Sequence, residues 1–323
     1  MTVRNPTSDL DFHLAGDTRK RLGDRALLAA AGLAVAGLVA LMVLLVYKVV
    51  DQARPAMSEF GLSFLTGTTW NAVTNQFGAL DLIWGTLATS LFALVIAGPV
   101  AIAIALFLTE LAPRVLRTPI GMLVELLAAI PSVILGLWGI IVMGPFLQAH
   151  VEPWMIDHLG FLPFFDGYPS AVGLLPACLI LSIMVVPIVA SITRELLSSV
   201  PSDLKAGSLA LGSTRWEMVR RVMLPQITGG LVAGVMLGFA RAIGEAIAVT
   251  QVIGGTASRH WSLFEPADTL ASRLASQYAG AATALQTASL AYLAVLLLII
   301  SVITNFIAQI IVVRVRRNQQ GTT

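Results

Sequence analysis

The chain has 323 residues, of which 57% are hydrophobic and 12% are charged, and its mean hydropathy is +0.84. These proportions exclude a soluble globule, whose surface needs more charged residues, and predict several membrane helices. The net charge of +2 is too small to indicate a nucleic-acid partner, and the basic residues are clustered rather than spread over a surface. The single cysteine, Cys178, excludes an internal disulfide, and the four histidines lack metal-ligand spacing.

Six apolar stretches follow one another along the chain, each long enough to cross roughly 30 Å of hydrocarbon. A polar segment, residues 1–25, precedes them, and a basic tail, residues 314–323, follows them. We therefore predict an all-α membrane protein of about six transmembrane helices, in contact with lipid, with its membrane domain at 26–313. Pro131 is expected to kink the third span. The predicted spans are 26–47, 80–108, 120–146, 171–192, 227–253 and 285–313.

The distribution of basic residues predicts the orientation. Fifteen lysines and arginines lie in the two termini, the 110–118 turn and the 194–221 loop, against four in the loops of the opposite side. Because basic loops stay in the cytoplasm, we expect both termini and the 194–221 loop there. The chain is thus predicted to be a multi-pass protein of the plasma membrane.

The loop 201–225 is predicted to contain two short helices with a glycine break between them. Ser202 or Asp203 can cap the first helix, and Gly212 interrupts it. Thr214 and Glu217 have the spacing of a capping box, which starts a second helix. Such a loop is either a stiff protrusion or an ordinary connector between spans, and local physics leaves both open.

The same loop resembles the cytoplasmic motif of ABC importer permeases, E-A-A-x3-G-x9-I-x-L-P. Ala206-Gly207-Ser208, Gly212, Val222 and Leu224-Pro225 have its spacing, although Ala206 stands where the family has glutamate. The resemblance implies the type I permease fold. It also implies a coupling helix that docks on a partner ATPase, through Ala206, Gly207, Ser208, Leu209 and Gly212.

Three further stretches are similar to the C-type permease subunits of phosphate-specific ABC importers. They are LTGTTWNAVTNQFGAL (65–80), ELLAAIPSVILGLWG (125–139) and the run from LGSTRWEMVRRVMLP to RAIGEAIAVTQVIGG (211–255). The resemblance implies a transport subunit rather than an enzyme. Its partners would be an A-type permease subunit, two ATP-binding cassette ATPase subunits and an extracytoplasmic phosphate-binding protein. The chain has no G-x-x-x-x-G-K-[ST] motif, so we expect it to bind no cofactor and the ATPase to use the ATP.

Small and charged residues share one face of the fifth predicted span. Gly230, Gly234, Gly238, Arg241 and Glu245 lie within about 80° of one another on a helical wheel. The three glycines are predicted to pack closely against another helix. Because ionisable groups in a span avoid lipid, we expect this face to point to the partner permease or the substrate pathway.

Arg241 is the predicted phosphate contact, because its guanidinium can donate two parallel hydrogen bonds to an oxyanion. Glu245, four residues on, can hold the arginine when no anion is present. The pair can instead be purely structural, and Glu125 is expected to have a positional role near its span end. A sulfate-like oxyanion is an alternative substrate. An ion-coupled secondary transporter is the less favoured alternative function.

Overall fold

The computed structural model describes residues 18–320, and it describes side chains for 25–314. Residues 1–17 of the predicted N-terminal segment and 321–323 of the tail lie outside the described residues. The elements in chain order are α1 (Thr18–Phe60), α2 (Ser63–Thr66), β1 (Trp70–Asn71), β2 (Gln76–Phe77), α3 (Leu80–Leu106), η2 (Phe107–Leu111), α4 (Arg114–Ala129), α5 (Ser132–Trp138), η3 (Gly139–Met143), α6 (Gly144–Phe146), η4 (Leu147–Val151), α7 (Glu152–Leu159), α8 (Leu174–Ser198), α9 (Ser202–Ala210), α10 (Arg215–Met218), η5 (Val219–Met223), α11 (Leu224–Ile243), α12 (Ile247–Val252), α13 (Leu270–Gln277) and α14 (Ala284–Gln320).

The described residues contain six helices long and apolar enough to cross a membrane, which confirms the predicted fold class. The first belongs mostly to a separate unit that ends at Asp51, and its apolar side chains between Leu27 and Tyr47 are exposed. An exposed apolar helix surface of this length is suited to contact with the hydrocarbon core of a membrane. The six candidate spans are Arg25–Phe60, Leu80–Leu111, Ser132–Leu159, Leu174–Ser198, Arg215–Ile243 and Ala284–Arg314.

The third span differs from the predicted 120–146. Helix α4 ends at Ala129, because Pro131 lacks an N–H and forces Ile130 into extended backbone. The apolar helical run then starts again at Ser132 and continues to Leu159 through three π-helical or short helical segments. The expected kink is thus a complete break. Much of the loop expected at 147–169 is helical.

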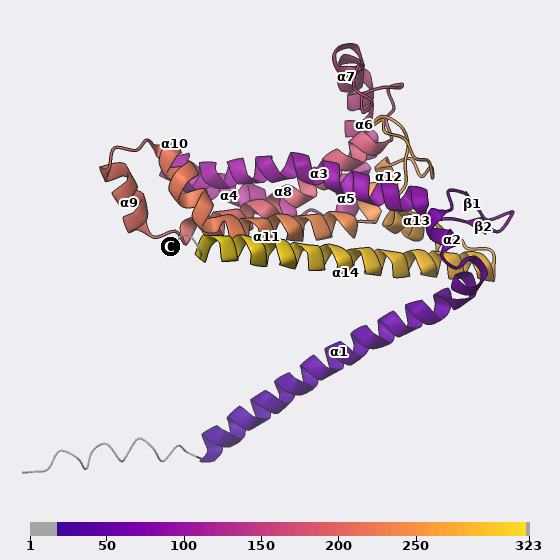
Figure 1. The fold of residues 1–323 in the computed structure, drawn as a ribbon, viewed down its shortest axis with the longest axis horizontal. Coiled ribbons are helices and arrows are strands. Elements are labelled where there is room, and N and C mark those ends of the chain that lie inside the picture. The colour runs from indigo at the N-terminus through magenta and orange to yellow at the C-terminus, as the bar shows by residue number, and fades with distance from the viewer. Residues whose placement is uncertain (1–17, 321–323) are drawn as a thin grey trace, which may run out of the picture. The chain divides into compact units, whose positions relative to one another are not determined.

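Within the second unit, residues 52–323, Figure 1 shows α9 and α10 at one end of the helix bundle. Helix α13 and the β1–β2 hairpin, in which Trp70 pairs with Phe77, lie at the other end. The C-terminal end of α14 lies at the α9 end. The polar loop 199–214 and the polar connector 254–269 therefore lie at opposite ends of the bundle.

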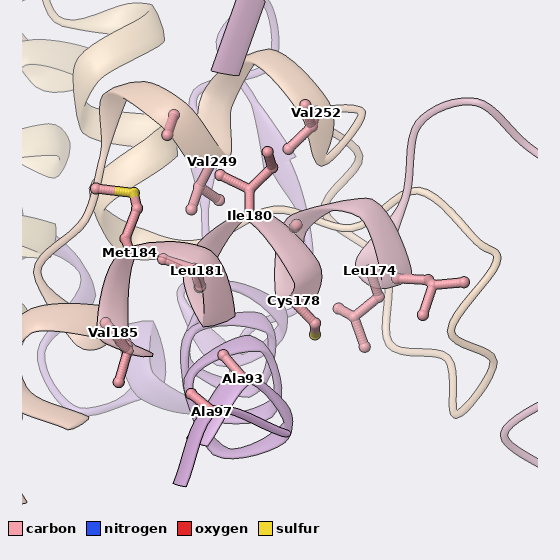
Figure 2. Packing of buried hydrophobic residues seen from close by; sticks show 14 of the residues in the cluster. Ala93, Ala97, Leu174, Cys178, Ile180, Leu181, Met184, Val185, Val249 and Val252 are labelled. Atoms are coloured by element: carbon pink, nitrogen blue, oxygen red, sulfur yellow. The ribbon is translucent and has the colours of Figure 1, made fainter. Parts of the chain in front are cut away.

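Helix α8 packs against both α3 and α11 and is the most buried of the candidate spans. Towards α3 it meets Ala93 and Ala97 (Figure 2). Together with Ala101 of the same cluster, these alanines are spaced four residues apart and fully buried. Ser182 Oγ donates a hydrogen bond to the Ala93 carbonyl oxygen at 3.1 Å. Cys178 packs in the same cluster as a buried apolar residue. Helices in lipid associate through such close contacts, because lipid offers apolar groups as good an environment as protein does.

Towards α11, α8 meets the three glycines of the predicted small-residue face. A Cβ atom added at Gly230 would lie 2.7 Å from Leu196 Cδ2, and one at Gly234 would lie 2.9 Å from Ile192 Cγ2. The expectation that this face points to the partner permease or the pathway is therefore wrong for the glycines. They bring α11 against α8 of the same chain.

We predict that Gly238→Ala destabilises the protein by about 1–3 kcal/mol. The new Cβ would lie 2.8 Å from methyl groups of Val185 and Val189, whose branched side chains have little freedom in a helix. Gly37→Ala is the matched control, because Gly37 lies inside α1 without a neighbouring proline and no atom lies within 4 Å of the added Cβ. It should keep or raise stability, since alanine favours helix over glycine by about 1 kcal/mol. Thermal unfolding in detergent measures both, and equal midpoints would contradict the packing.

Candidate functional site

Arg241 and Glu245 lie at a break in the fifth predicted span. The run 227–253 is not one helix, because α11 ends at Ile243 and α12 begins at Ile247. Arg241 occupies the last turn of α11, where the negative end of the helix dipole favours a cation. Glu245 lies outside both helices and faces the start of α12.

Arg241 and Glu245 form an ion pair in which the carboxylate is buried and the guanidinium is open. Arg241 Nη2 lies 3.3 Å from Glu245 Oε2, and the side chains are 52% and 6% exposed. Ala248 N–H donates to Glu245 Oε1 at 3.5 Å. No second carboxylate lies within ion-pair distance of Arg241 in the described part of the chain. Because a guanidinium has five N–H donors, most of those of Arg241 are free to bind an anion.

Helix α9 carries the residues of the family motif and stands clear of the bundle. None of its residues is buried, including Ala206, Gly207 and Leu209. Its N-cap position is Pro201 rather than the expected Ser202 or Asp203, and no side chain caps it. The exposed helix is therefore free to contact another protein.

The segment after α9 has the predicted break and cap. Gly212 has φ +86°, a left-handed conformation that glycine adopts at low cost. Ser208 and Ser213 share a hydrogen bond of 2.7 Å across this turn. Thr214 and Glu217 form the capping box that starts α10. The loop is thus a stiff structure rather than a slack linker.

Two ion pairs anchor this end of the bundle. Lys205 Nζ on α9 lies 2.8 Å from Glu110 Oε1 on η2. Arg194 Nη2 on α8 lies 2.6 Å from Glu125 Oε1 on α4, which gives Glu125 a positional contact. Both pairs line a cavity of about 970 Å3 between η2, α4 and α8. The pairs therefore join α9 and α8 to the segments that follow α3.

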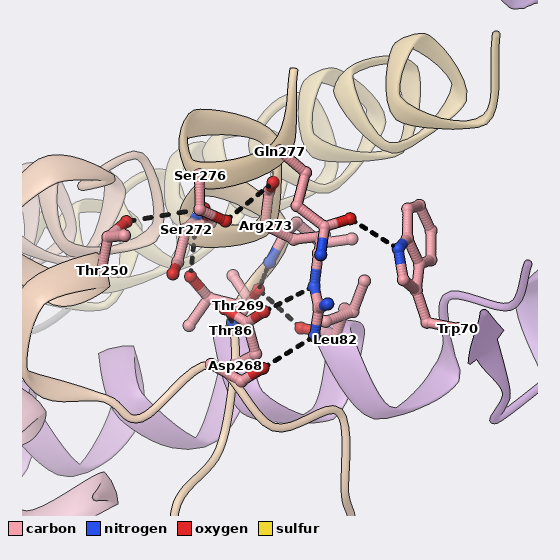
Figure 3. Close-up of polar contacts among 12 residues, drawn as sticks. Trp70, Leu82, Thr86, Thr250, Asp268, Thr269, Ser272, Arg273, Ser276 and Gln277 are labelled. Atoms are coloured by element: carbon pink, nitrogen blue, oxygen red, sulfur yellow. Dashed lines mark hydrogen bonds and ion pairs between the residues drawn. The ribbon is translucent and has the colours of Figure 1, made fainter. Parts of the chain in front are cut away.

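Sequence reasoning missed a buried ion pair at the opposite end of the bundle (Figure 3). Arg273 Nε lies 2.6 Å from Asp268 Oδ2, and the two side chains are 8% and 1% exposed. Thr269 caps α13 between them, and the Arg273 guanidinium lies 5.7 Å from the Trp70 ring centroid. The Thr269 cap signal was visible in the sequence. The pairing was not, because it depends on how the connector folds back.

The hydroxyls of α3 are occupied by backbone partners. Thr89 and Ser90 donate to carbonyl oxygens one turn back in their own helix. Thr86 Oγ1 donates to the Leu82 carbonyl and accepts from Leu270 N–H at 2.9 Å, which ties α3 to α13. These contacts are structural. Within the chain whose side chains are described, no cluster of three His, Cys, Asp or Glu could hold a metal ion.

Comparisons with known proteins agree on one group. The family model of the binding-protein-dependent transport system inner membrane component matches residues 97–317. A phosphate transport system permease protein PstC from Mesorhizobium japonicum is 46% identical over 264 residues, which cover 80% of this chain and 81% of the relative. The PstC protein from Haemophilus influenzae is 43% identical over 268 residues, which cover 82% and 85%.

A solved structure matches the fold. It is the crystal structure of a bacterial alginate ABC transporter in complex with an alginate pentasaccharide-bound periplasmic protein. One of its chains aligns with a TM-score of 0.59 at 18% identity, covering 91% of this chain and 97% of that chain. At this identity the likeness concerns the fold alone.

We predict that Arg273→Met destabilises the protein by about 3–5 kcal/mol at neutral pH, because Asp268 would stay buried without its partner. Burial raises the pKa of Asp268, and Arg273 opposes this rise. Removing Arg273 would raise the pKa further, so the folded state would bind a proton more tightly than the unfolded chain. Stability is then lost as pH rises, and the defect should be smaller at pH 5 than at pH 8.

Arg220→Met is the matched control for this pH dependence. Arg220 is exposed, and its removal leaves no buried carboxylate without a partner among the described residues, so its loss should cost little. Unfolding midpoints of both variants across the pH range make the comparison. A defect of Arg273→Met that does not change with pH would contradict the role of Asp268.

Proposed function

The chain belongs to the family of binding-protein-dependent transport system inner membrane components, and from this premise we propose that it is the permease subunit of an ATP-driven ABC importer that translocates inorganic phosphate. The observation that supports phosphate as the substrate is the 46% and 43% identity to PstC proteins over four fifths of the chain. The chain is a transport subunit and not an enzyme. Sulfate and ion-coupled transport have no comparable support.

The proposed assembly has four kinds of component. An A-type permease subunit forms a heterodimer with this chain, and two ATP-binding cassette subunits bind ATP on the cytoplasmic side. A phosphate-binding protein docks on the loops at the opposite end of the bundle, where α13 and the β1–β2 hairpin lie. This chain itself binds no cofactor. The basic-residue count supports cytoplasmic termini and a cytoplasmic loop 201–225.

In this proposal α9 is the coupling helix. The exposure of Ala206, Gly207 and Leu209, the left-handed Gly212 and the capping box support docking of Ala206 to Leu209 in the ATPase. A push on α9 would reach α8 directly, since only Ser199 to Pro201 separate the two helices. It would reach α11 through α10 and the buried Met218, Val219 and Met223. The loop therefore transmits movement to two packed spans together.

Arg241 is the proposed phosphate contact. Its open guanidinium lies beside a broken helix, and such breaks expose backbone groups that ligands use in other transporters. Glu245 holds the guanidinium through one nitrogen and leaves other donors for the phosphate. Phosphate would compete with Glu245 for the arginine. Because Glu245 can take back the arginine, the phosphate would be released along the pathway rather than remain bound.

We expect Arg241→Gln to abolish phosphate uptake by the assembled transporter in proteoliposomes, because the anion loses its charged donor. Arg241→Lys should lower uptake roughly tenfold or more, since lysine keeps the charge but not the fork. Arg25→Gln, which removes a cation outside the family-matched region, should transport normally. Uptake of labelled phosphate measures all three.

Assembly is the control for this series, because Arg241→Gln leaves Glu245 buried without its partner. Each variant is compared at equal amounts of the purified complex, and Glu245→Gln is combined with Arg241→Gln to remove the unpaired charge. Normal uptake by the assembled double variant would refute the role of Arg241. Inhibition of wild-type uptake by excess sulfate would refute the choice of phosphate.

Gly212→Val should uncouple ATP hydrolysis from uptake. A β-branched residue is strained at φ +86° by about 1–3 kcal/mol, so the turn after α9 would change. Gly212→Asn is the matched control, because asparagine tolerates the left-handed region and no atom lies within 4 Å of the added Cβ. ATPase activity and uptake are measured together. Equal coupling in the two variants would show that the turn conformation is not needed.

A further inference from the structure

A second cavity, of about 670 Å3, lies beside the coupling loop, where η2, α4, α9 and α10 meet. We call it the arginine cavity. Leu209 of the proposed ATPase contact lies in its lining, and the proposed transport function gives no role to the arginines of the cavity. Its charged lining consists of Arg114, Arg117, Lys205, Arg215 and Glu110.

The charge of the arginine cavity is unbalanced. Lys205 and Glu110 neutralise each other through their 2.8 Å ion pair. Arg117 Nε donates to the Ala112 carbonyl oxygen at 3.0 Å. No carboxylate lies within ion-pair distance of Arg114, Arg117 or Arg215 in the described part of the chain. Three guanidinium groups therefore remain available to bind an anion.

The apolar lining places the cavity at the boundary of the membrane. Leu106 and Leu111 belong to the end of the candidate span Leu80–Leu111, and Met218 belongs to the start of Arg215–Ile243. Leu111 is 60% exposed and Trp216, also in the lining, is 64% exposed. Tryptophan favours the level of lipid headgroups. A ligand with an anionic head and an apolar tail matches both parts of this lining.

We propose that the arginine cavity binds the phosphate headgroup of an anionic phospholipid of the surrounding membrane. The guanidinium forks donate paired hydrogen bonds to the phosphate oxygens, and the acyl chains lie along the exposed leucines. A free phosphate would satisfy the charges but leave the apolar lining in water. The lipid therefore fits the whole cavity better.

The bound lipid would link the bilayer to the coupling loop. Its headgroup would connect Arg114 and Arg117 near the start of α4 with Arg215 at the start of α10. Lys205 of α9 lies in the wall of the same cavity. Occupancy would thus hold α9 and α10 in a fixed position relative to the end of α3, which is the position that the ATPase meets.

Native mass spectrometry of the purified full chain, titrated with phosphatidylglycerol or phosphatidylcholine, tests the proposal. We expect tighter binding of phosphatidylglycerol. Each arginine replaced by glutamine should weaken it about fivefold, so that Arg114→Gln with Arg215→Gln loses about twenty-fivefold. Arg220→Gln with Arg221→Gln is the matched control, because it removes the same charge from exposed residues of the loop that do not line the cavity.

Four results would overturn the proposal. One is equal binding of the two lipids. Another is equal loss of phosphatidylglycerol binding in the cavity and control variants. The third is displacement of the lipid when the ATPase subunit is added, which would make the cavity part of that interface. The fourth is displacement of phosphatidylglycerol by inorganic phosphate at millimolar concentration, which would indicate a free-phosphate site. Arg114→Gln alone, at an exposed residue, keeps the test open if the double variant misfolds.

Discussion

Close packing on the two sides of α8 is the constraint on which the second unit depends. Alanines of α3 and glycines of α11 let three backbones approach, and the added Cβ distances at Gly230 and Gly234 show how little space remains. In lipid there is no hydrophobic driving force between helices, so the van der Waals contacts made at this short distance hold the helices together. It also makes α8 and α11 one rigid body, so movement of the loop between them cannot be absorbed by sliding. Arg241 lies less than one turn beyond the last of these glycines.

Breaks in the helices lie where the packing leaves room for polar groups. The break at Ile130 directly precedes Pro131, which lacks a backbone N–H, whereas Pro99 and Pro187 lie inside the continuous helices α3 and α8. The break after Ile243 frees backbone N–H groups at the start of α12, and Glu245 accepts one of them from Ala248. The same carboxylate holds Arg241. The buried Glu245 carboxylate thus both accepts a hydrogen bond from the start of α12 and pairs with Arg241, the proposed substrate contact. This ion pair stabilises the partly exposed Arg241 guanidinium within the membrane protein.

Charged side chains are paired and buried at one end of the bundle, whereas several lack a carboxylate partner at the other end. At the α13 end, Asp268 and Arg273 are buried together and brace the connector against α3 and Trp70. At the α9 end, three guanidiniums without a carboxylate partner among the described residues line a cavity beside the exposed helix α9. The first arrangement fixes local structure. The second leaves a charge that a ligand from the membrane can neutralise.

Local chemistry determined much of this protein from the sequence alone. Hydropathy placed the spans, because lipid demands an apolar run wherever the chain crosses. Gly212 and the Thr214–Glu217 box predicted the turn and the start of α10, since both depend on neighbouring residues only. Tertiary structure alone decided which helix the glycines meet and that Asp268 reaches Arg273. The physical reason is that packing and ion pairs join segments far apart in the chain, and spacing along the sequence does not determine those distances.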